Sequence, residues 1–325
     1  MILGTVSALR RAGVLGLNCR NSEYTLKYNQ RRFYPLVDDK VLCKQRLKER
    51  DLPVPDLIGV VEFNSQAAHL DDLIGATREF VIKPANGSGG SGILVITDRR
   101  ADYFLDSDSR LVLKEDLTHH LTNVIGGLYS LGGQPDVAMI ESLVHFDPLF
   151  AQLTYHGVPD IRVIVFKGYP VMAMTRLPTR MSHGKANLHQ GAIGAGIDLA
   201  SGTTFGGVSG NNLVETHPDT GHPIEGFQIP NWARIMDMAA QCYEAVELGY
   251  LGVDIVLDRD LGPLILELNA RPGLNIQLAN RRGLRGRLDA IEALGSRHEL
   301  PARRVEWSRR MFGDEQAGGG GPAAA

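Results

Sequence analysis

Two short apolar runs near the carboxyl end of the chain carry three side chains with oxygen ligands, and this feature most constrains the fold. The runs span residues 252–258 (GVDIVLD) and 262–269 (GPLILELN), and a tight polar return separates them. This spacing predicts a β-hairpin. If Asp258 faces Pro263, antiparallel counting sets Asp254 opposite Glu267 and leaves Asn269 on the same face. The apolar side chains of the other face are then expected in a core: Ile255, Leu257, Leu266 and Leu268.

The three polar side chains of this hairpin indicate a cation site. Two neighbouring carboxylates on an otherwise apolar hairpin repel each other and lose solvation unless something positive lies between them. Mg²⁺ prefers oxygen ligands, and Mn²⁺ is the alternative ion. We therefore predict Asp254, Glu267 and Asn269 as metal ligands. The competing interpretation is a polar stripe that faces solvent.

Composition sets broad limits on the protein. The chain has 325 residues, is 43% hydrophobic and 22% charged, and carries a formal net charge of −3. This is the profile of a globular protein with two or three packed subdomains, and no global charge favours nucleic acid. The three cysteines show no zinc or redox spacing, and no apolar run reaches membrane-spanning length. We expect a cytoplasmic protein with reduced cysteines, no membrane insertion and no nucleic-acid partner.

The rest of the chain alternates between strand and helix patterns. Strands are predicted at 14–17, 80–84, 93–96, 137–140, 161–166 and 170–175, and helices at 40–50, 114–131 and 232–246. Residues 177–212 are rich in glycine and lack periodicity, so we expect an irregular functional or mobile segment there.

A glycine-rich loop lies between the predicted strands 80–84 and 93–96. Its sequence, NGSGGSG at 86–92, follows Lys83 at the end of the first strand. Glycines at this density let backbone N–H groups close over an anion, and the lysine can reach phosphate oxygens. A flexible hairpin with a solvated lysine is the alternative. The upstream Lys40 and the downstream carboxylate hairpin favour phosphate binding.

Together these motifs resemble the ATP-grasp superfamily, and within it the α-L-glutamate ligase branch, which includes ligases that add glutamate to ribosomal protein tails. The resemblance runs from about residue 39 to 277. It rests on GVD at 252–254, on ELNARPG at 267–273, which fits the E-x-N-x-x-P-G motif, on NLHQG at 187–191 and on DIR at 160–162.

The resemblance implies an α+β fold in which two α+β lobes clasp ATP, preceded by a truncated N-terminal α/β segment. The implied domains are a short segment over 1–38, an N-terminal lobe over 39–135, a C-terminal lobe with the metal site over 136–290, and a C-terminal helix with a disordered tail over 291–325.

The resemblance also implies roles for individual residues. Arg162, Arg176 and Asn187 would act in catalysis. The residues that would bind the nucleotide are Lys40, Lys83, Gly87, Ser88, Gly89, Gly90, Ser91, Lys185 and the interlobe hinge of Glu141, Ser142, Leu143 and Val144, where Glu141 would contact adenine. The lid would lie in residues 177–196.

The implied activity is an ATP- and Mg²⁺-dependent carboxylate–amine ligase that forms an amide through an acylphosphate. Its partners would be ATP, a carboxylate donor and an amine acceptor, with glutamate or another amino acid joined to a peptide or small acceptor, and the chain is expected to form homo-oligomers. The alternatives are an ATP-binding regulator without chemistry, a grasp-fold enzyme linked to sugar transfer or cell-envelope modification, and a phosphotransferase. The sequence specifies neither donor nor acceptor. We also expect Asp254→Asn and Glu267→Gln to leave the melting temperature nearly unchanged.

Overall fold

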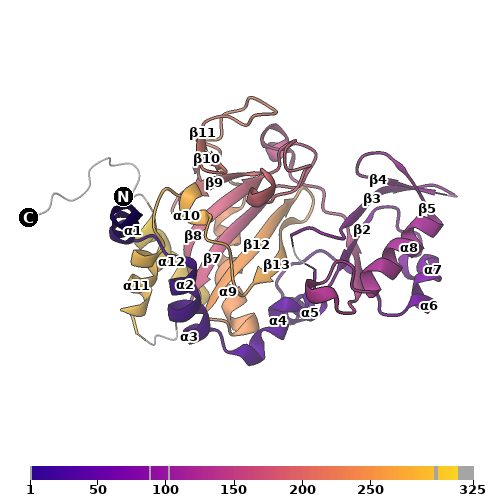
Figure 1. The fold of residues 1–325 in the computed structure, drawn as a ribbon, viewed down its shortest axis with the longest axis horizontal. Helices are drawn as coiled ribbons and strands as arrows, with labels where there is room; N and C mark the ends of the chain where they lie inside the picture. The colour runs from indigo at the N-terminus through magenta and orange to yellow at the C-terminus, as the bar shows by residue number, and fades with distance from the viewer. Residues whose placement is uncertain (1, 88, 102, 296–298, 314–325) are drawn as a thin grey trace, which may run out of the picture. The chain divides into compact units, whose positions relative to one another are not determined.

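The computed structural model describes residues 2–87, 89–101, 103–295 and 299–313. They form two compact units (Figure 1). Unit 1 combines Met1–Tyr34 with Phe146–Ala325, and unit 2 is Pro35–His145. The domain boundaries implied by the resemblance stay predictions. The expected disordered tail falls largely on residues 314–325, which lie outside the described residues.

Unit 2 is built on a six-stranded sheet in the order β1-β6-β2-β3-β4-β5, in which neighbouring strands run antiparallel. The strands are β1 (Leu57–Val61), β2 (Phe80–Pro84), β3 (Leu94–Arg99), β4 (Tyr103–Asp106), β5 (Leu111–Leu113) and β6 (Ala138–Ser142). The predicted strands at 80–84, 93–96 and 137–140 correspond to β2, β3 and β6. Alternate residues such as Phe80 and Ile82 enter the core of this unit.

The helices of unit 2 are α4 (Pro35–Asp38), α5 (Lys40–Lys48), α6 (Asn64–Ala67), α7 (Leu70–Ile74), α8 (Lys114–Ile125) and the 3₁₀ turn Leu131–Gly133. Helix α5 begins where the sequence predicts, because Asp39 Oδ1 accepts from the backbone N–H groups of Val41 and Leu42. Helix α8 is shorter than the predicted 114–131. Gly127 follows its end with φ of 83°, and a Cβ there would lie 2.2 Å from the carbonyl oxygen of Gln134.

Unit 1 is built on a seven-stranded sheet in the order β11-β10-β9-β8-β7-β12-β13. The strands are β7 (Asp160–Phe166), β8 (Tyr169–Leu177), β9 (Ile193–Ile197), β10 (Thr204–Ser209), β11 (Asn212–Val214), β12 (Tyr250–Asp258) and β13 (Gly262–Asn269). Every neighbouring pair is antiparallel. The predicted strands 161–166 and 170–175 correspond to β7 and β8.

The prediction of an irregular segment over 177–212 is wrong for its second half, while residues 178–192 contain only turns, irregular backbone and the short 3₁₀ turn Leu188–Gln190. Strands β9 and β10 lie inside it and extend the sheet. The glycines that hid the strand pattern make room for neighbours: a Cβ on Gly196 would lie 2.6 Å from Phe205 Cε2 and 2.7 Å from the carbonyl oxygen of Ala279. Glycine in a strand here reflects close packing rather than disorder.

The carboxylate hairpin has the predicted register at its functional positions. Asp254 pairs with Glu267. At the turn, however, Asp258 pairs with Gly262 rather than Pro263, and a β-bulge between Asp254 and Ile255 takes up the difference. Of the side chains predicted for the core, Ile255, Leu257 and Leu268 are buried, while Leu266, next to the bulge, is only half-buried.

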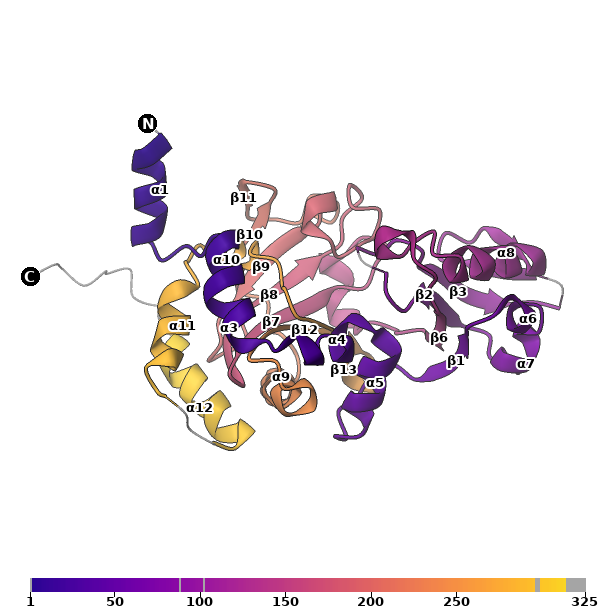
Figure 2. The same cartoon turned by 60° about the horizontal axis from the view of Figure 1, so that its bottom comes forward.

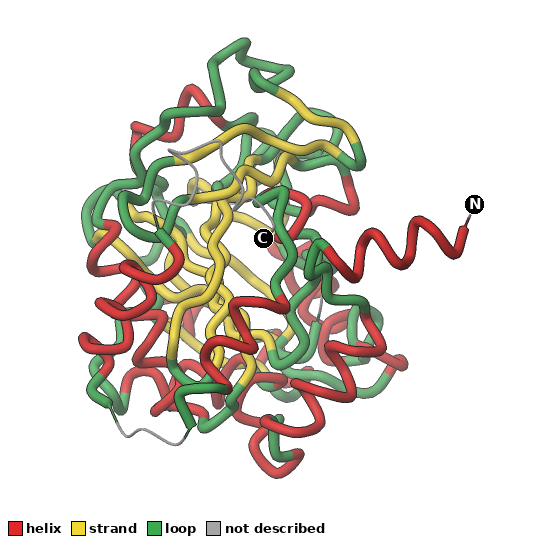
Figure 3. Tube along the Cα trace, turned by 90° about the vertical axis from the view of Figure 1, so that its left-hand side faces the viewer, coloured by secondary structure: helices red, strands yellow, loops and turns green. Residues whose placement is uncertain are grey.

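The first 34 residues contain helical turns and belong to unit 1. They are α1 (Ile2–Arg11), α2 (Leu17–Cys19), a π-helical turn (Arg20–Thr25), α3 (Leu26–Tyr28) and a 3₁₀ turn (Arg31–Phe33). The strand predicted at 14–17 is absent. Asn29 ties this segment to the sheet, because its side chain donates to the carbonyl oxygens of Tyr250 and Ala270 and accepts from the N–H of Tyr250. Helix α1 projects from the rest of unit 1 (Figure 3).

The remaining helices of unit 1 are α9 (Trp232–Val246), α10 (Ile276–Ala279), α11 (Arg285–Glu292) and α12 (Pro301–Phe312), with 3₁₀ turns at Pro148–Leu153 and Leu188–Gln190. Helix α9 matches its prediction and packs across β7, β8, β12 and β13, and α12 packs on α9 and β8 (Figure 2). Within the described ranges, no helix combines the length and apolar character needed to cross a bilayer.

Arg304 of α12 joins these layers. Its guanidinium is buried and donates to the carbonyl oxygens of Gly168 (3.0 Å) and Glu299 (2.6 Å), and it pairs with Glu244 at 2.5 Å. Removal of one member of a buried ion pair leaves the charge of the other member without a partner, which is destabilising.

We therefore predict that Arg304→Ala lowers the free energy of unfolding by about 2 kcal/mol, below the range for a fully buried pair because Glu244 is 34% exposed and partly regains solvent. Urea denaturation measures this. The exposed neighbour Arg303 is the matched control, and Arg303→Ala should change stability by less than about 0.5 kcal/mol. Equal effects of the two substitutions would contradict the assignment.

Candidate functional site

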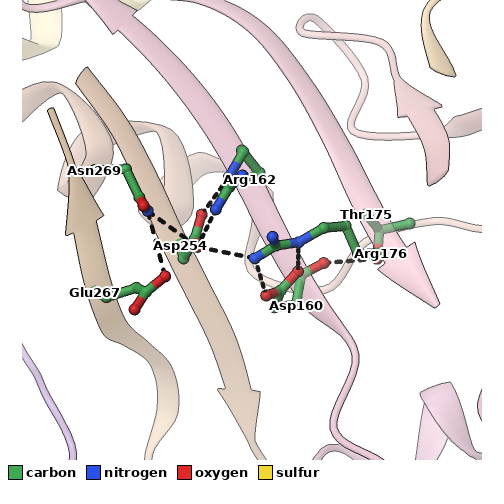
Figure 4. Close-up of polar contacts among 7 residues, drawn as sticks. All are labelled: Asp160, Arg162, Thr175, Arg176, Asp254, Glu267 and Asn269. Carbon is green, nitrogen blue, oxygen red and sulfur yellow. Dashed lines mark hydrogen bonds and ion pairs between the residues drawn. The ribbon is translucent and has the colours of Figure 1, made fainter. Parts of the chain in front are cut away.

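Four neighbouring strands bring two of the predicted catalytic side chains, Arg162 and Arg176, together with the three predicted metal ligands (Figure 4). In the sheet register, Asp254 of β12 pairs with Arg162 of β7 on one side and with Glu267 of β13 on the other. Arg176 of β8 pairs with Asp160 of β7. Because side chains alternate along a strand, Asp160 and Arg162 lie on the same face.

The carboxylate of Asp254 is the centre of this cluster. It is fully buried and accepts from Arg162 Nε at 2.7 Å and Nη2 at 2.5 Å, a two-point contact with one guanidinium. Arg176 Nη2 donates to the same carboxylate at 2.8 Å. Burial alone would raise the pKa of Asp254, but Arg162 and Arg176 lower it well below its usual range. Asp254 is therefore ionised and bridges two cations.

Asp160 is a member of the cluster that sequence reasoning did not assign to the site. Arg176 donates to it through Nε at 2.6 Å and through Nη2. Burial raises the pKa of Asp160 to about 6, because desolvation and the nearby Asp254 carboxylate together outweigh Arg176. The available signal was the spacing in the DIR string, since residues two apart on a strand share a face.

Glu267 and Asn269 complete the predicted set of metal ligands. Asn269 Nδ2 donates to Asp254 Oδ2 at 3.2 Å and to Glu267 Oε1 at 3.4 Å. No cluster of three or more His, Cys, Asp or Glu side chains suited to a metal occurs in the described part of the chain, and the predicted set has two carboxylates and one amide. Its chemistry fits a hard cation, since rotation of the Asn269 amide would present Oδ1 in place of Nδ2.

In unit 2, Lys83 is joined by a lysine that the sequence did not single out. Lys83 lies on β2, and its Nζ contacts Glu141 Oε1 from the neighbouring strand β6. Lys44 of α5 reaches Glu141 Oε2 at 2.9 Å and donates to the carbonyl oxygen of Pro55 at 2.8 Å. All three side chains are buried. Lys44 was missed because a lysine within a polar helix is ordinarily exposed.

The charges of this trio offset one another. Burial alone would raise the pKa of Glu141, but Lys83 and Lys44 lower it. Burial lowers the pKa of Lys44 against the attraction of Glu141. In this structure the Glu141 carboxylate is bound to lysines, so contact of that side chain with adenine stays a prediction.

The glycine-rich loop is held at its start. Lys40 Nζ donates to the carbonyl oxygens of Ala85 (3.1 Å) and Gly87 (2.6 Å). Asp136 accepts from the backbone and side chain of Asn86. Gly89 and Gly90 have φ of 67° and 77°, which L side chains rarely adopt. Ser91 is exposed, and Ser88 lies outside the described residues.

Other predicted site residues have different surroundings. Ser142 exchanges hydrogen bonds with Asp56, and the hinge residues Leu143 and Val144 are half-buried. Lys185 is exposed, and Asn187 Oδ1 caps the turn at His189. Across the described ranges, no hydrogen bond or ion pair joins Lys185 or Asn187 to the Asp254 cluster.

These contacts correct the expectation that Asp254→Asn leaves stability unchanged. We predict that this substitution lowers the free energy of unfolding by about 3 kcal/mol, because a neutral amide cannot balance two buried guanidinium groups. Glu267→Gln should cost less than about 1 kcal/mol, since Glu267 is half-buried and its hydrogen bond from Asn269 is long. Urea denaturation without metal compares the two, and a larger loss for Glu267→Gln would contradict this assignment.

Comparison with solved structures gives similarities at low identity. PsnB complexed with a minimal precursor is 16% identical with a TM-score of 0.45, covering 83% of this chain and 63% of PsnB. D-alanine–D-alanine ligase from Bacillus anthracis is 15% identical with a TM-score of 0.46, covering 85% of this chain and 70% of the ligase. D-cycloserine synthetase DcsG is 15% identical with a TM-score of 0.42, covering 84% and 71%.

This chain spans less than two thirds of the length of PsnB. No curated protein sequence matches the chain significantly.

The family comparison is decisive for membership. The model of the family described as "Sugar-transfer associated ATP-grasp" matches residues 19–293, which is most of the chain and includes every strand of both described sheets. The glutamate-ligase subtype stays a prediction. The chain belongs to the sugar-transfer associated family of the ATP-grasp superfamily and has the ATP-grasp fold.

Proposed function

We propose that this protein is an ATP- and Mg²⁺-dependent carboxylate–amine ligase that forms an amide through an acylphosphate. The observation that carries the proposal is the Asp254 cluster. One face of one sheet holds the oxygen-bearing side chains Asp254, Glu267 and Asn269 beside two guanidinium groups. Such a set can hold a cation and also stabilise an anion that forms next to it.

Ligand-binding roles are proposed within each unit. In unit 1, Asp254, Glu267 and Asn269 would hold Mg²⁺, which when bound neutralises charge on the phosphates. In unit 2, Lys83, Lys40 and the N–H groups of the glycine-rich loop would hold the phosphates. This proposal includes Gly87, Ser88, Gly89, Gly90 and Ser91. The hinge residues Glu141, Ser142, Leu143 and Val144 would bind the base, and Lys185 would approach the nucleotide from the lid.

Each of the two arginines has a hydrogen-bond donor that could contact a substrate. Arg162 and Arg176 each use Nε and Nη2 for the carboxylates, and the described hydrogen bonds leave Nη1 of each free for a substrate. Such a donor would stabilise charge on the acylphosphate and then on the tetrahedral oxyanion. Loss of one contact of this kind typically costs about 3 kcal/mol of transition-state stabilisation.

The reaction has two steps. A substrate carboxylate oxygen attacks the γ-phosphorus of ATP, the bond to the β-phosphate oxygen breaks, and ADP leaves. The amine nitrogen of the acceptor then attacks the acyl carbon, phosphate leaves with the bonding pair, and the nitrogen loses a proton to give the amide. Water must be excluded between the steps, and we assign this role to the segment that contains Asn187.

The family description favours a second candidate for the substrate. A family described as associated with sugar transfer supports an acceptor or donor that carries a sugar, as in modification of the cell envelope. An ATP-binding regulator without chemistry is disfavoured because the ligand set of Asp254, Glu267 and Asn269 is complete.

The test is ADP formation in a screen of substrate pairs. Amino acids, short peptides, amino sugars and uronic acids are combined with ATP and Mg²⁺, and products are identified by mass. We expect ADP and phosphate in equal amounts together with an amide, and Glu267→Gln should abolish turnover while remaining folded. ATP binding without turnover on any pair would favour the regulator, and a stable phosphorylated product would favour a phosphotransferase.

Lys83 gives a separate prediction for nucleotide binding. Lys83→Ala should weaken ATP binding about 10-fold or more, because a charge-assisted contact to phosphate is lost. Calorimetric titration with ATP and Mg²⁺ measures the change. Lys48, an exposed lysine of the same unit, is the matched control, and Lys48→Ala should bind ATP like the wild type. An unchanged affinity of Lys83→Ala for ATP would contradict the assignment of strand β2 to the nucleotide site.

A further inference from the structure

The N-terminal segment places a buried guanidinium group beside the sheet of unit 1. Arg20 is 6% exposed. Its Nη1 donates to the carbonyl oxygen of Pro272 at 2.7 Å, and its Nε donates to Asn21 Oδ1 at 2.8 Å. Among the described residues, no carboxylate pairs with Arg20. A buried cation ordinarily has an anionic partner, because desolvation of an unpaired charge is costly.

A buried hydroxyl near Arg20 also lacks a partner. Tyr250 is fully buried, and its Oη has no hydrogen-bond partner in the described structure. Two contacts place Tyr250 near Arg20: the Asn29 side chain donates to the carbonyl oxygens of both Tyr250 and Ala270, and Gly252 packs against Pro272, whose carbonyl oxygen accepts from Arg20. Burial lowers the pKa of Arg20 and raises that of Tyr250, and each group partly offsets the shift of the other. Buried polar groups are nearly always satisfied, so an orphaned hydroxyl beside an unpaired guanidinium indicates a missing partner that can accept from both.

A second cation extends this cluster toward solvent. Arg271 adjoins Pro272 in the chain, the residue whose carbonyl oxygen accepts from Arg20. The Arg271 guanidinium lies over the ring of Tyr34, 4.7 Å from its centroid, and the side chain is exposed. In the described structure it forms no ion pair. The cluster therefore runs from a buried cation to an exposed one with no carboxylate between them.

The position of the cluster connects it to the candidate site. Tyr250 and Asp254 are four residues apart on β12 and so share a face of the sheet, about 13 Å apart at a rise of roughly 3.3 Å per residue. Pro272, which accepts from Arg20, follows Asn269 in the same motif. Gly252 lies between Tyr250 and Asp254 on that face of the strand, and Pro272 packs over it: a Cβ on Gly252 would lie 2.7 Å from Pro272 Cβ.

We propose that Arg20, Tyr250 and Arg271 form a subsite for a substrate carboxylate that is not the one activated by ATP. The inference rests on the proposed ligase function and specifies its substrate class. The planar guanidinium matches a carboxylate in a two-point contact, and the tyrosine hydroxyl donates a further hydrogen bond. The spacing along β12 favours a substrate whose free carboxylate lies several bonds from the reacting centre, as in a peptide with a free C-terminus.

The test measures carboxylate binding to the full-length protein without ATP or Mg²⁺. Thermal unfolding is followed with increasing acetate, with inorganic phosphate, and with chloride at equal ionic strength, because a ligand that binds the folded state raises the melting temperature. We expect acetate to stabilise the wild type more than chloride does. Arg20→Gln should weaken acetate binding about 10-fold or more, since a charge-assisted contact is lost.

Tyr250→Phe keeps the test decisive if Arg20→Gln fails to fold. It removes one oxygen that has no described partner, so the protein without acetate should be at least as stable as the wild type, while acetate binding weakens several-fold. Tyr169→Phe, at another buried tyrosine of unit 1, is the matched control and should bind acetate like the wild type.

The proposal is overturned if acetate stabilises the wild type no more than chloride does, or if Tyr250→Phe binds acetate as tightly as the wild type. Stronger stabilisation by phosphate than by acetate would indicate that the subsite binds a phosphate group, and would overturn its assignment to a carboxylate. Because nucleotide and metal are absent, failure here is separate from failure of the ligase proposal, which Glu267→Gln tests by turnover.

Discussion

The buried carboxylate of Asp254 between Arg162 and Arg176 is the interaction on which the site depends. A lone carboxylate at the centre of a sheet would be strongly disfavoured, and so would two lone guanidinium groups. Together with Asp160 they offset one another, and their strands hold them on one face. The same pairing fixes both arginines by two donors each, so their remaining donors are oriented before any substrate arrives.

Local sequence pattern was sufficient for the hairpin and the glycine-rich loop. The alternation of apolar and polar residues over 252–269 predicted which side chains share a face, because strand geometry has a period of two. The pairing of Asp254 with Glu267 was correct even though the turn pairs differently, since a β-bulge shifts the register by one residue. The bulge itself could not be predicted, because a bulge depends on packing in three dimensions rather than on the alternation of residues along the strand.

The missed features share a long-range cause. Strand β9 contains Gly194 and Gly196, and glycine has a low propensity for strands. Phe205 and Ala279 occupy the space that side chains at these positions would need. Lys44 lies in a polar helix, and only the fold brings it to Glu141. The sequence of the N-terminal segment suggests a fragment of a separate domain, yet Asn29 forms hydrogen bonds with residues more than 200 positions later. None of these partners can be inferred from neighbours in the sequence.

The connectivity of the two units has a consequence for the order in which they form. Unit 2 is one continuous stretch of chain inserted into unit 1, whose first segment ends at Tyr34 and resumes at Phe146. During synthesis the inserted unit has all its strands before the host sheet has begun. The early segment must wait for β12 to emerge before Asn29 finds its partners, so the host unit closes late and across a long loop of chain. In ribosome-associated intermediates of this protein, unit 2 should therefore be folded while unit 1 is still incomplete.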